Sequence, residues 1–351
     1  MSCLRILHVV FSSRLAGSER YCLDLANRQA AAGHEVHVAG MSSSPLGEEL
    51  SPEVRFHGFS WFFRRLLLHR LVDRLAPDIC HGHLSAACKA LGGISDRHQT
   101  VATLHVGFKE HQHGRLSGLI CVNRAQSARL SGYAGFSRVI SNWIPATPRN
   151  GTAPGIRKEL GLDADVFLVG AVGRLHRSKG MDVLITAFRA SAPARAALVI
   201  LGEGPQRSKL EQLCDGDPRI HLLGYRPEVQ HCLRDLDVFV SPSREESFGL
   251  AILEAMSDGL PIIATAAEGP AEFLRDQPAV LVPPGSSDAL ATALTSAHAH
   301  FRNNGLPRIG YDLSLFDPAA RLDNISDFYT HIIATKQRSR AEVARPVAVA
   351  T

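Results

Sequence analysis

The chain of 351 residues lacks the long apolar runs that a membrane-spanning helix requires. A span takes about 20 consecutive apolar residues, and no run in this sequence approaches that length. The opening stretch MSCLRILHVVFSS has no small-residue cleavage site and is typical of a first buried strand. The seven cysteines form no closely spaced pair and leave one over, so a disulfide framework is not expected. These absences favour a protein of the reducing cytoplasm.

Charge is distributed unevenly along the chain, although the net charge is only +4. Residues 1–150 hold 17 Lys and Arg against 10 Asp and Glu, together with 11 of the 17 histidines. A basic half favours an anionic partner, either a phosphate-bearing substrate or an acidic membrane surface. The basic residues are spread out and form no recognizable nucleic-acid-binding module, so no nucleic-acid partner is expected.

Short apolar runs alternate with helix-like segments through both halves of the chain, a pattern typical of α/β folds with parallel sheets. Because the runs are almost continuously apolar, helices should cover both faces of each sheet. The expected strands are residues 5–11, 34–40, 54–59, 78–83, 100–105, 118–123 and 137–143, then 166–173, 196–204, 220–225, 236–243, 260–265 and 279–284. Between the two series, residues 145–155 are dense in Pro, Gly, Thr and Asn, as in an interdomain linker.

We therefore predict two doubly wound, Rossmann-like domains that face each other across a cleft, residues 1–150 and residues 151–314. The last helical segment, residues 315–333, is expected to pack back on the first domain. Residues 334–351 have no sustained apolar face and are expected to form a tail. Ligands of such sheets bind beyond the carboxyl ends of the strands, so the loops after the strands are the candidate functional segments.

Two cationic residues follow the first expected strand of the second domain. Arg174 and Lys179 lie on the loop before the next helix, where backbone N–H groups and the helix dipole also favour an anion. Two cations at this place suit a diphosphate. A solvated loop whose charges bind nothing is the alternative.

The stretch SREESFGLAILEAM places Glu246 and Glu254 eight residues apart around a Phe-Gly-Leu turn. If a helix begins near Phe248, the amides of Phe248, Gly249 and Leu250 form an open N-terminus that can hold a phosphate. Glu254, in the second turn, is suited to ribose hydroxyls, and Glu246 to a sugar. The alternative is an acidic turn that stabilises its own helix by a few tenths to about 1 kcal/mol.

The order and spacing of these motifs resemble the C-terminal domain of family-4 glycosyltransferases of the GT-B fold, as found in bacterial glycan and lipopolysaccharide synthesis. The matching segments are GRLHRSKGMDVLITAF, LGEGPQRSKLE, LLGY, SPSREESFGLAILEAMSDGLPIIAT, EGPAEFL and VLVPPGSSDALATAL. The family's Glu-x7-Glu pattern is matched by Glu246 and Glu254. More loosely, AGSERYCLDLANRQAAAGHEVHVAG, PDICHGH and ATLH look like the family's Gly-Gly-x-Glu-Arg loop, its Asp-x-x-His-x-His strand end and its Thr-x-His strand end.

The resemblance implies roles for residues of the second domain. Arg174 and Lys179 would bind the donor's diphosphate, and Glu254 would bind the ribose. Glu246 would contact the hydroxyls of the transferred sugar. The loop after Gly224, which begins with Tyr225 and Arg226, would hold the base through backbone groups.

In the first domain, the resemblance implies that Gly17 and its loop approach the donor's phosphate and sugar. His105 would lie beside the sugar as a catalytic residue, together with Glu246. The family loop usually has two glycines, and the first is Ala16 here. Alanine would cost about 1 kcal/mol or more if that position needs a positive φ. The family is retaining and metal-independent, so no cofactor and no metal are expected.

Other histidines are weaker candidates. Cys80, His81 and His83 form a metal-like cluster, but strand alternation puts only the two histidines on one face, and no third ligand is near in sequence. A metal site is therefore not expected. His111 and His113 follow His105 on a loop that could touch an acceptor, with a solvated loop as the alternative.

The segment Trp61–Leu75 combines bulky apolar residues with four arginines. It fits a basic amphipathic helix lying on an anionic membrane, and equally a helix that covers the sheet with an ordinary polar face. Together with the basic charge of the first half, it favours peripheral contact with the inner face of the cell membrane.

We therefore expect a retaining, metal-independent hexosyltransferase. It would move a sugar from a nucleotide diphosphate sugar to a hydroxyl of a glycan or glycolipid. A UDP-sugar is the favoured donor, and GDP-mannose is the main alternative. Two other functions stay open. One is a GT-B epimerase acting on UDP-sugars, which needs its own acid and base residues. The other is a nucleotide-sugar-binding protein without turnover.

Overall fold

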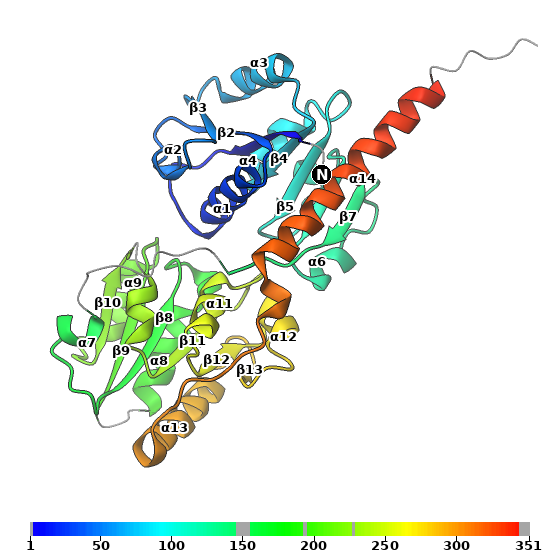
Figure 1. Ribbon diagram of the computed structural model, residues 1–351. Coiled ribbons are helices and arrows are strands. Elements are labelled where there is room, and N and C mark those ends of the chain that lie inside the picture. The colour runs from blue at the N-terminus through cyan, green and yellow to red at the C-terminus, as the bar shows by residue number, and fades with distance from the viewer. Residues whose placement is uncertain (1–2, 145–154, 192–194, 227–228, 344–351) are drawn as a thin grey trace, which may run out of the picture. The chain divides into compact units, whose positions relative to one another are not determined.

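The computed structural model describes residues 3–144, 155–191, 195–226 and 229–343. It divides into two compact units, Met1–Pro145 with Phe316–Thr351, and Ala146–Leu315. Each unit is built on one parallel sheet with helices around it (Figure 1). The predicted α/β class and the two Rossmann-like sheets are confirmed. The expected linker lies outside the described residues apart from Gly155.

The first unit contains every strand that its apolar runs predicted. Its strands are β1 (Arg5–Val10), β2 (Glu35–Met41), β3 (Arg55–Phe59), β4 (Ile79–His83), β5 (Thr100–Leu104), β6 (Gly118–Cys121) and β7 (Phe136–Val139). Its helices are α1 (Gly17–Ala31), α2 (Leu46–Glu49), α3 (Arg64–Leu75), α4 (Leu84–Gly92), α5 (Glu110–His113), α6 (Arg124–Ala128) and α14 (Pro318–Val343). The strand order is β3-β2-β1-β4-β5-β6-β7, so the winding direction changes between β1 and β4.

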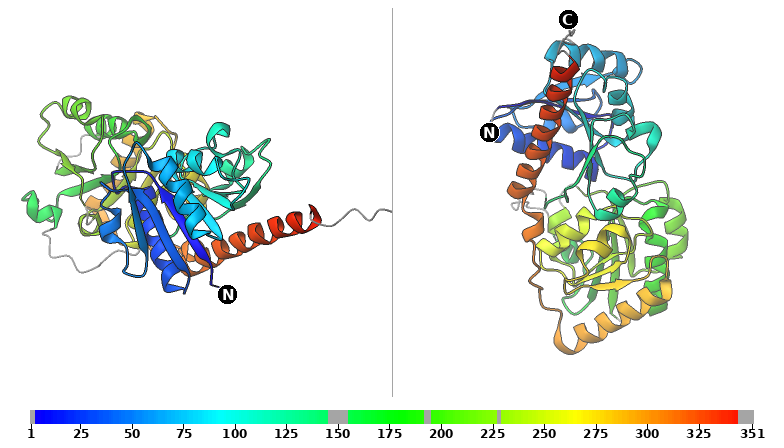
Figure 2. Two further views of the ribbon diagram at one scale, coloured as in Figure 1. Left: turned by 90° about the horizontal axis from the view of Figure 1, so that it is seen from above. Right: turned by 90° about the vertical axis from the view of Figure 1, so that its right-hand side faces the viewer.

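Alternation along the strands separates the two faces of this sheet. Leu7 and Val9 of β1 pack in the cluster that includes α3 and α4, whereas Ile6 packs in the cluster that includes α1 and α14. Helix α14 lies beside α1 on the second face (Figure 2). It buries Phe328 and Tyr329 there, so the last helix belongs to the first unit.

The predicted start of the tail at residue 334 is wrong, because α14 continues to Val343. The segment ATKQRSRAEV has no apolar face, but it is rich in Ala, Lys, Gln, Arg and Glu. These residues have high helix propensity, so the helix continues through this segment. Residues 344–351 lie outside the described residues.

The second unit also contains every predicted strand. Its strands are β8 (Phe167–Val172), β9 (Ala196–Leu201), β10 (Ile220–Gly224), β11 (Val238–Ser241), β12 (Ile262–Thr265) and β13 (Val280–Val282). Its helices are α7 (Ile156–Glu159), α8 (Met181–Ser191), α9 (Arg207–Cys214), α10 (Val229–Arg234), α11 (Leu250–Ser257), α12 (Glu268–Phe273) and α13 (Ser287–Asn304), with short 3₁₀ turns at Arg177–Lys179 and Ser314–Phe316. The strand order is β10-β9-β8-β11-β12-β13.

The seven cysteines all lie in the described residues, and no disulfide joins any two of them, as expected. Among the described helices, none combines the length and the apolar character that crossing a bilayer would take.

Candidate functional site

The loops that follow β8 and β11 meet where the strand order of the second unit changes direction. Sheets of this type bind ligands at such a switch point. Backbone hydrogen bonds join the two loops, because the amides of Arg244 and Glu245 donate to the carbonyl of Ser178 at 2.8 and 3.1 Å. The fold thus brings the two motifs of the predicted donor site to one place.

Two further contacts hold these loops in position. Gly180 has a φ of +64°, and a Cβ there would lie 2.0 Å from the carbonyl oxygen of Pro242, so only glycine fits. The guanidinium of Arg244 donates to both carboxylate oxygens of Asp182, at 2.7 and 2.8 Å. This bidentate bond lowers the pKa of Asp182. The protein itself therefore fixes the loop geometry.

The ammonium of Lys179 forms an ion pair with the carboxylate of Glu246. The hydroxyl of Ser243 donates to the same carboxylate oxygen at 3.4 Å. The stem of Lys179 passes Gly173, where a Cβ would lie 3.8 Å from Lys179 Cγ and Cδ. Arg174 follows Gly173 directly, and its side chain is exposed. Lys179 and Glu246 are therefore in contact, next to the backbone that carries Arg174.

Helix α11 begins at Leu250, with Gly249 as its N-cap at a φ of +100°. This is two residues later than predicted, because Phe248 is buried against Phe273 and Gly249 makes the turn into the helix. A Cβ at Gly249 would lie 3.4 Å from Glu246 Cγ, so the start of α11 adjoins Glu246. The amides of Gly249 and Leu250 belong to this helix start, whereas Phe248 anchors the loop.

The residues predicted to hold the ribose and the base have different surroundings. Glu254 lies in the second turn of α11, as predicted, and is half-buried. Gly224 ends β10 with a φ of +74°, and Tyr225 behind it is exposed. Arg226 forms an ion pair with Glu159 of α7 at 2.5 Å. In this structure Arg226 therefore joins two parts of the unit, and Tyr225 is the more accessible of the two residues.

In the first unit, Gly17 is the first residue of α1 and is exposed. Ala16 before it is the N-cap and has extended backbone, with φ −109° and ψ −169°. The carboxylate of Glu19 accepts the amide N–H of Ala16 at 3.2 Å. The suspected strain at Ala16 is therefore absent, since this position needs no positive φ.

Four histidines gather on the sheet face that α1 and α14 cover. His8, His81 and His83 are fully buried, and His105 is half-buried. The sequence showed no third nitrogen near His81 and His83, but parallel pairing places His8 of β1 opposite His81 of β4. One ring nitrogen of each buried histidine lies within 4.8 Å of the others, close enough for a metal ion. The only sequence signal for His8 was a polar residue inside an apolar strand.

All six ring nitrogens of the buried histidines have hydrogen-bond partners within the protein. Nε2 of His8 contacts Gln29, and Nδ1 of His8 contacts His83. His81 contacts Tyr329 Oη at 2.5 Å and Thr103 Oγ1 at 2.8 Å, and the remaining nitrogen of His83 contacts His105. A metal ion would have to displace several of these bonds.

Burial keeps this cluster uncharged. It lowers the pKa of His8 and of His105 to about 4, and it lowers the pKa values of His81 and His83 well below 6.5. His113, suggested as a loop residue near an acceptor, is instead buried in α5 and accepts the amide N–H of Lys109 at 3.0 Å.

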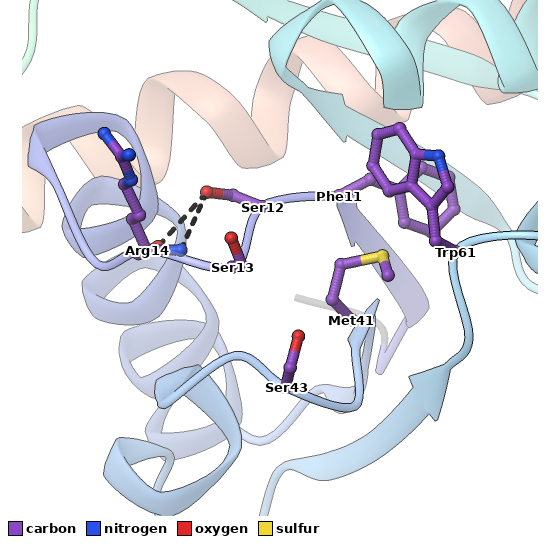
Figure 3. Close-up of a pocket in the computed structure, with 7 residues that line it drawn as sticks. All are labelled: Phe11, Ser12, Ser13, Arg14, Met41, Ser43 and Trp61. Atoms are coloured by element: carbon purple, nitrogen blue, oxygen red, sulfur yellow. Dashed lines mark hydrogen bonds between the residues drawn. The ribbon is translucent and has the colours of Figure 1, made fainter. Parts of the chain in front are cut away.

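A pocket of about 440 Å³ opens beyond the ends of β1 and β2 (Figure 3). It is lined by Phe11, Ser12, Ser13, Arg14, Met41, Ser43 and Trp61. Serine hydroxyls thus share the pocket with an aromatic and thioether wall, and Arg14 lies at its edge (Figure 3). Sequence reasoning missed it because its lining comes from separate loops.

The α3 apolar surface adjoins this pocket at Trp61. It consists of Trp61, Phe62, Phe63 and Leu66, which are 52%, 89%, 63% and 50% exposed. The opposite side of α3 is buried in the core of the unit. The guanidinium of Arg64 lies 3.6 Å over the ring of Trp61. The segment is thus a sheet-covering helix that also carries an exposed aromatic surface.

Comparisons with known proteins agree with this arrangement. Residues 15–145 match the family model Glycosyltransferase Family 4, and residues 166–300 match Glycosyl transferases group 1. The lipopolysaccharide core biosynthesis mannosyltransferase LpsB of Rhizobium meliloti (strain 1021) is 36% identical over an alignment of 281 residues, and the match covers 73% of this chain and 75% of LpsB. The lipopolysaccharide core biosynthesis glycosyltransferase LpsD of the same organism is 25% identical over an alignment of 309 residues, and the match covers 83% of this chain and 87% of LpsD.

Among solved structures, that of HepE from Anabaena in complex with UDP-glucose superimposes with a TM-score of 0.79. The match covers 93% of this chain and 100% of the HepE chain. Because the sequences are only 21% identical, this match shows a shared fold and nothing more. The chain belongs to the family-4 glycosyltransferases, and it is a transferase of the GT-B fold. The resemblance seen in the motifs is confirmed, and this membership favours transfer over the epimerase and the non-catalytic alternatives.

Proposed function

We propose that this glycosyltransferase moves a sugar from a nucleotide diphosphate sugar to a hydroxyl of a glycan or glycolipid, in lipopolysaccharide or polysaccharide synthesis. The observation that carries the proposal is the contact of Lys179 with Glu246 at the switch point of the second unit, beside the exposed Arg174. Cationic side chains next to a helix start suit a diphosphate. A UDP-sugar is the favoured donor, and the complex of HepE with UDP-glucose supports this choice.

Each group of this site has a distinct proposed role. Lys179 and Arg174 neutralise the diphosphate, and the amides of Gly249 and Leu250 donate to it. Because Lys179 is already paired with Glu246, a bound diphosphate would share the ammonium with the carboxylate. Glu246 would then accept hydrogen bonds from hydroxyls of the transferred sugar.

We assign the ribose hydroxyls to Glu254 and the base to the backbone after Gly224. The proposed reaction is retaining and independent of metal. Fixed positive charge stabilises the departing nucleotide diphosphate, and such preorganised charge is usually the largest catalytic contribution. The acceptor hydroxyl attacks on the same face, and the departing phosphate takes its proton.

The pocket of the first unit is a proposed acceptor site. Its serine hydroxyls suit sugar hydroxyls, and Arg14 suits a phosphate or carboxylate. Trp61 belongs to this pocket and also to the α3 apolar surface. An amphiphilic acceptor fits both features, with its sugar in the pocket and its lipid along the surface. The exposed Arg65 and Arg70 on α3 support contact with an anionic membrane.

A mannosyl donor is the second candidate. LpsB, at 36% identity, is named as a mannosyltransferase. The base loop would hold guanine as well as uracil if it contacts the base through backbone groups. GDP-mannose therefore stays the main alternative to a UDP-sugar.

Thermal-shift screening of the full chain against UDP, GDP and ADP sugars tests the donor class, because a ligand that binds only the folded state raises the melting temperature. The stabilising donor is then incubated with the enzyme in EDTA, and release of free nucleotide diphosphate is followed. We expect stabilisation by one nucleotide and slow release without added metal. Stabilisation with no release from any donor would contradict the proposed transfer. Release that stops in EDTA and returns with a divalent cation would contradict metal independence.

A further inference from the structure

A chain of hydrogen bonds runs from Gln29 in α1 to His105 through two buried histidines. Oε1 of Gln29 lies 2.6 Å from Nε2 of His8, and Nδ1 of His8 lies 3.0 Å from Nε2 of His83. Nδ1 of His83 lies 3.3 Å from Nε2 of His105. Gln29, His8 and His83 are fully buried. The chain therefore connects the interior of the first unit with a residue that is partly exposed.

Each link of this chain determines the next, because a neutral imidazole has one N–H donor and one acceptor nitrogen. The amide oxygen of Gln29 only accepts, so His8 donates from Nε2 and accepts at Nδ1. His83 then donates from Nε2 and accepts at Nδ1. His105 in turn donates from Nε2, which leaves its Nδ1 with an unshared electron pair.

The surroundings of His105 keep its ring in one orientation. The ring stacks on His83 with centroids 5.6 Å apart, and Tyr21 meets it edge-on at 5.0 Å. Among the described residues, no side chain or backbone group is hydrogen-bonded to Nδ1 of His105. Burial disfavours the imidazolium form of all three rings, which preserves the alternation of donors and acceptors.

We propose that Gln29, His8 and His83 are positioning residues that hold His105 in the Nε2–H form, with Nδ1 offered as a hydrogen-bond acceptor to a hydroxyl of a sugar substrate. This inference rests on the proposed function, in which His105 lies beside the sugar. A hydroxyl can donate to Nδ1, whereas an unprotonated phosphate oxygen or a carbonyl cannot. The hydrogen-bond chain therefore makes Nδ1 of His105 selective for a hydroxyl-bearing group.

A half-turn rotation of the Gln29 side-chain amide would reverse the direction of every hydrogen bond in this chain of residues. Its Nε2 would then donate to His8, each histidine would donate from Nδ1, and His105 would present an N–H to the substrate. The two directions predict opposite tautomers at three rings, so they can be distinguished without any substrate.

The first test is NMR of the ligand-free full chain with ¹⁵N-labelled histidines at neutral pH. Long-range couplings from ring carbon-bound protons identify the protonated nitrogen. We expect His8, His83 and His105 all to carry the proton on Nε2. A proton on Nδ1 of His105, or a mixture of forms, would overturn the inference. Changes at His8 and His83 on addition of equimolar Zn²⁺ would overturn it as well, because they would make the cluster a metal site.

The second test compares two variants of the same buried cluster. Gln29→Leu removes the acceptor that starts the chain, and we expect a mixture of tautomers at His105. Thr103→Val removes a hydroxyl that contacts His81 but belongs to no residue of the hydrogen-bond chain, and is the matched control. Using the donor found by thermal-shift screening, we expect Gln29→Leu to lower kcat about tenfold at unchanged donor KM. Thr103→Val should stay within about twofold of the original kcat.

Unchanged tautomers and unchanged kcat in Gln29→Leu would overturn the inference. If a variant does not fold, the histidine tautomers of the unsubstituted protein still test the inference. If the original enzyme releases nucleotide from no donor, the proposed function fails, yet the NMR result on the ligand-free chain stands independently.

Discussion

Lys179 and Glu246 form an ion pair that joins the loops after β8 and β11. Their side chains are only 27% and 14% exposed, so both charges are largely removed from water. Desolvation opposes such a pair, and good geometry is needed to offset it. The bidentate bond of Arg244 to Asp182 and the backbone bonds to Ser178 supply that geometry. A charge pair held in this way at the switch point is suited to a charged ligand.

Replacing Glu246 with Gln separates the two roles of this pair. Glu246→Gln frees the ammonium of Lys179, so we expect UDP, which has no sugar to contact, to bind as tightly as before or a few-fold tighter. Transfer should slow by about tenfold or more, because the contact to the sugar hydroxyls weakens. Glu245→Gln, at the exposed neighbouring position, is the control. Calorimetric titration with UDP and steady-state nucleotide release measure the two effects. Markedly weaker UDP binding would contradict the assignment.

The buried histidines make the stability of the first unit depend on pH. Burial lowers the pKa of His8 and of His105 from 6.5 to about 4, and lowers the pKa values of His81 and His83 well below 6.5. Between about pH 4 and pH 6.5, the unfolded protein binds more protons at these histidines than the folded protein does. The free energy of unfolding is therefore highest above pH 6.5 and falls as the pH drops toward 4. Each histidine contributes about 1.4 kcal/mol per pH unit within this window.

Tryptophan fluorescence measures this effect selectively, because both tryptophans of the chain, Trp61 and Trp143, belong to the first unit. Urea unfolding between pH 7.5 and 5 should show a midpoint that falls steeply below about pH 6.5. A midpoint that stays constant down to pH 5 would show that these histidines are not held neutral.

The backbone at Ala16 predicts the outcome of restoring the family's glycine there. Because Ala16 has φ −109°, glycine relieves no strain and only adds freedom to the unfolded chain. We expect Ala16→Gly to lower the free energy of unfolding by up to about 1 kcal/mol and to leave donor affinity unchanged. Urea unfolding and nucleotide titration check both. A more stable variant, or one with tighter donor binding, would show that this position favours a positive φ.

The α3 apolar surface is expected to bind anionic vesicles. Phe62→Ser combined with Phe63→Ser should reduce sedimentation with phosphatidylglycerol vesicles by about tenfold or more, since burying one phenylalanine contributes about 1.5–3 kcal/mol. Leu315→Ser, at an exposed apolar position of the second unit, is the control. Equal binding by the aromatic variant and the original chain would contradict a role for this surface.

The strands could be predicted because apolar runs and loops alternate clearly along the chain. The run at residues 196–204, for example, becomes β9 (Ala196–Leu201), followed by a tight loop at Gly202 and Gly204. The donor motif was also predictable, because Arg174, Lys179 and Glu246 lie on loops whose common edge follows from the fold class. The contact between Lys179 and Glu246 was not, since it depends on how the two loops pack.

Features that depend on tertiary packing could not be predicted from the sequence. The register between β1 and β4 places His8 opposite His81, and nothing local to either residue indicates that pairing. Helix α11 starts at Leu250, later than predicted, because Phe248 is buried in the loop before it. A single buried loop residue produces no periodic pattern in the sequence, so this burial could not be predicted. Ala16 was suspected of strain on the basis of the family's glycine, yet its conformation is ordinary.

The most direct measurement is calorimetric titration of UDP into the original chain and into Lys179→Ala, both in EDTA. Lys209→Ala, which removes an exposed lysine of α9 in the same unit, is the control. We expect binding at one site in the original chain, the same affinity for Lys209→Ala, and at least about tenfold weaker binding for Lys179→Ala. An affinity for Lys179→Ala within about twofold of the original would show that the diphosphate does not bind at this ammonium.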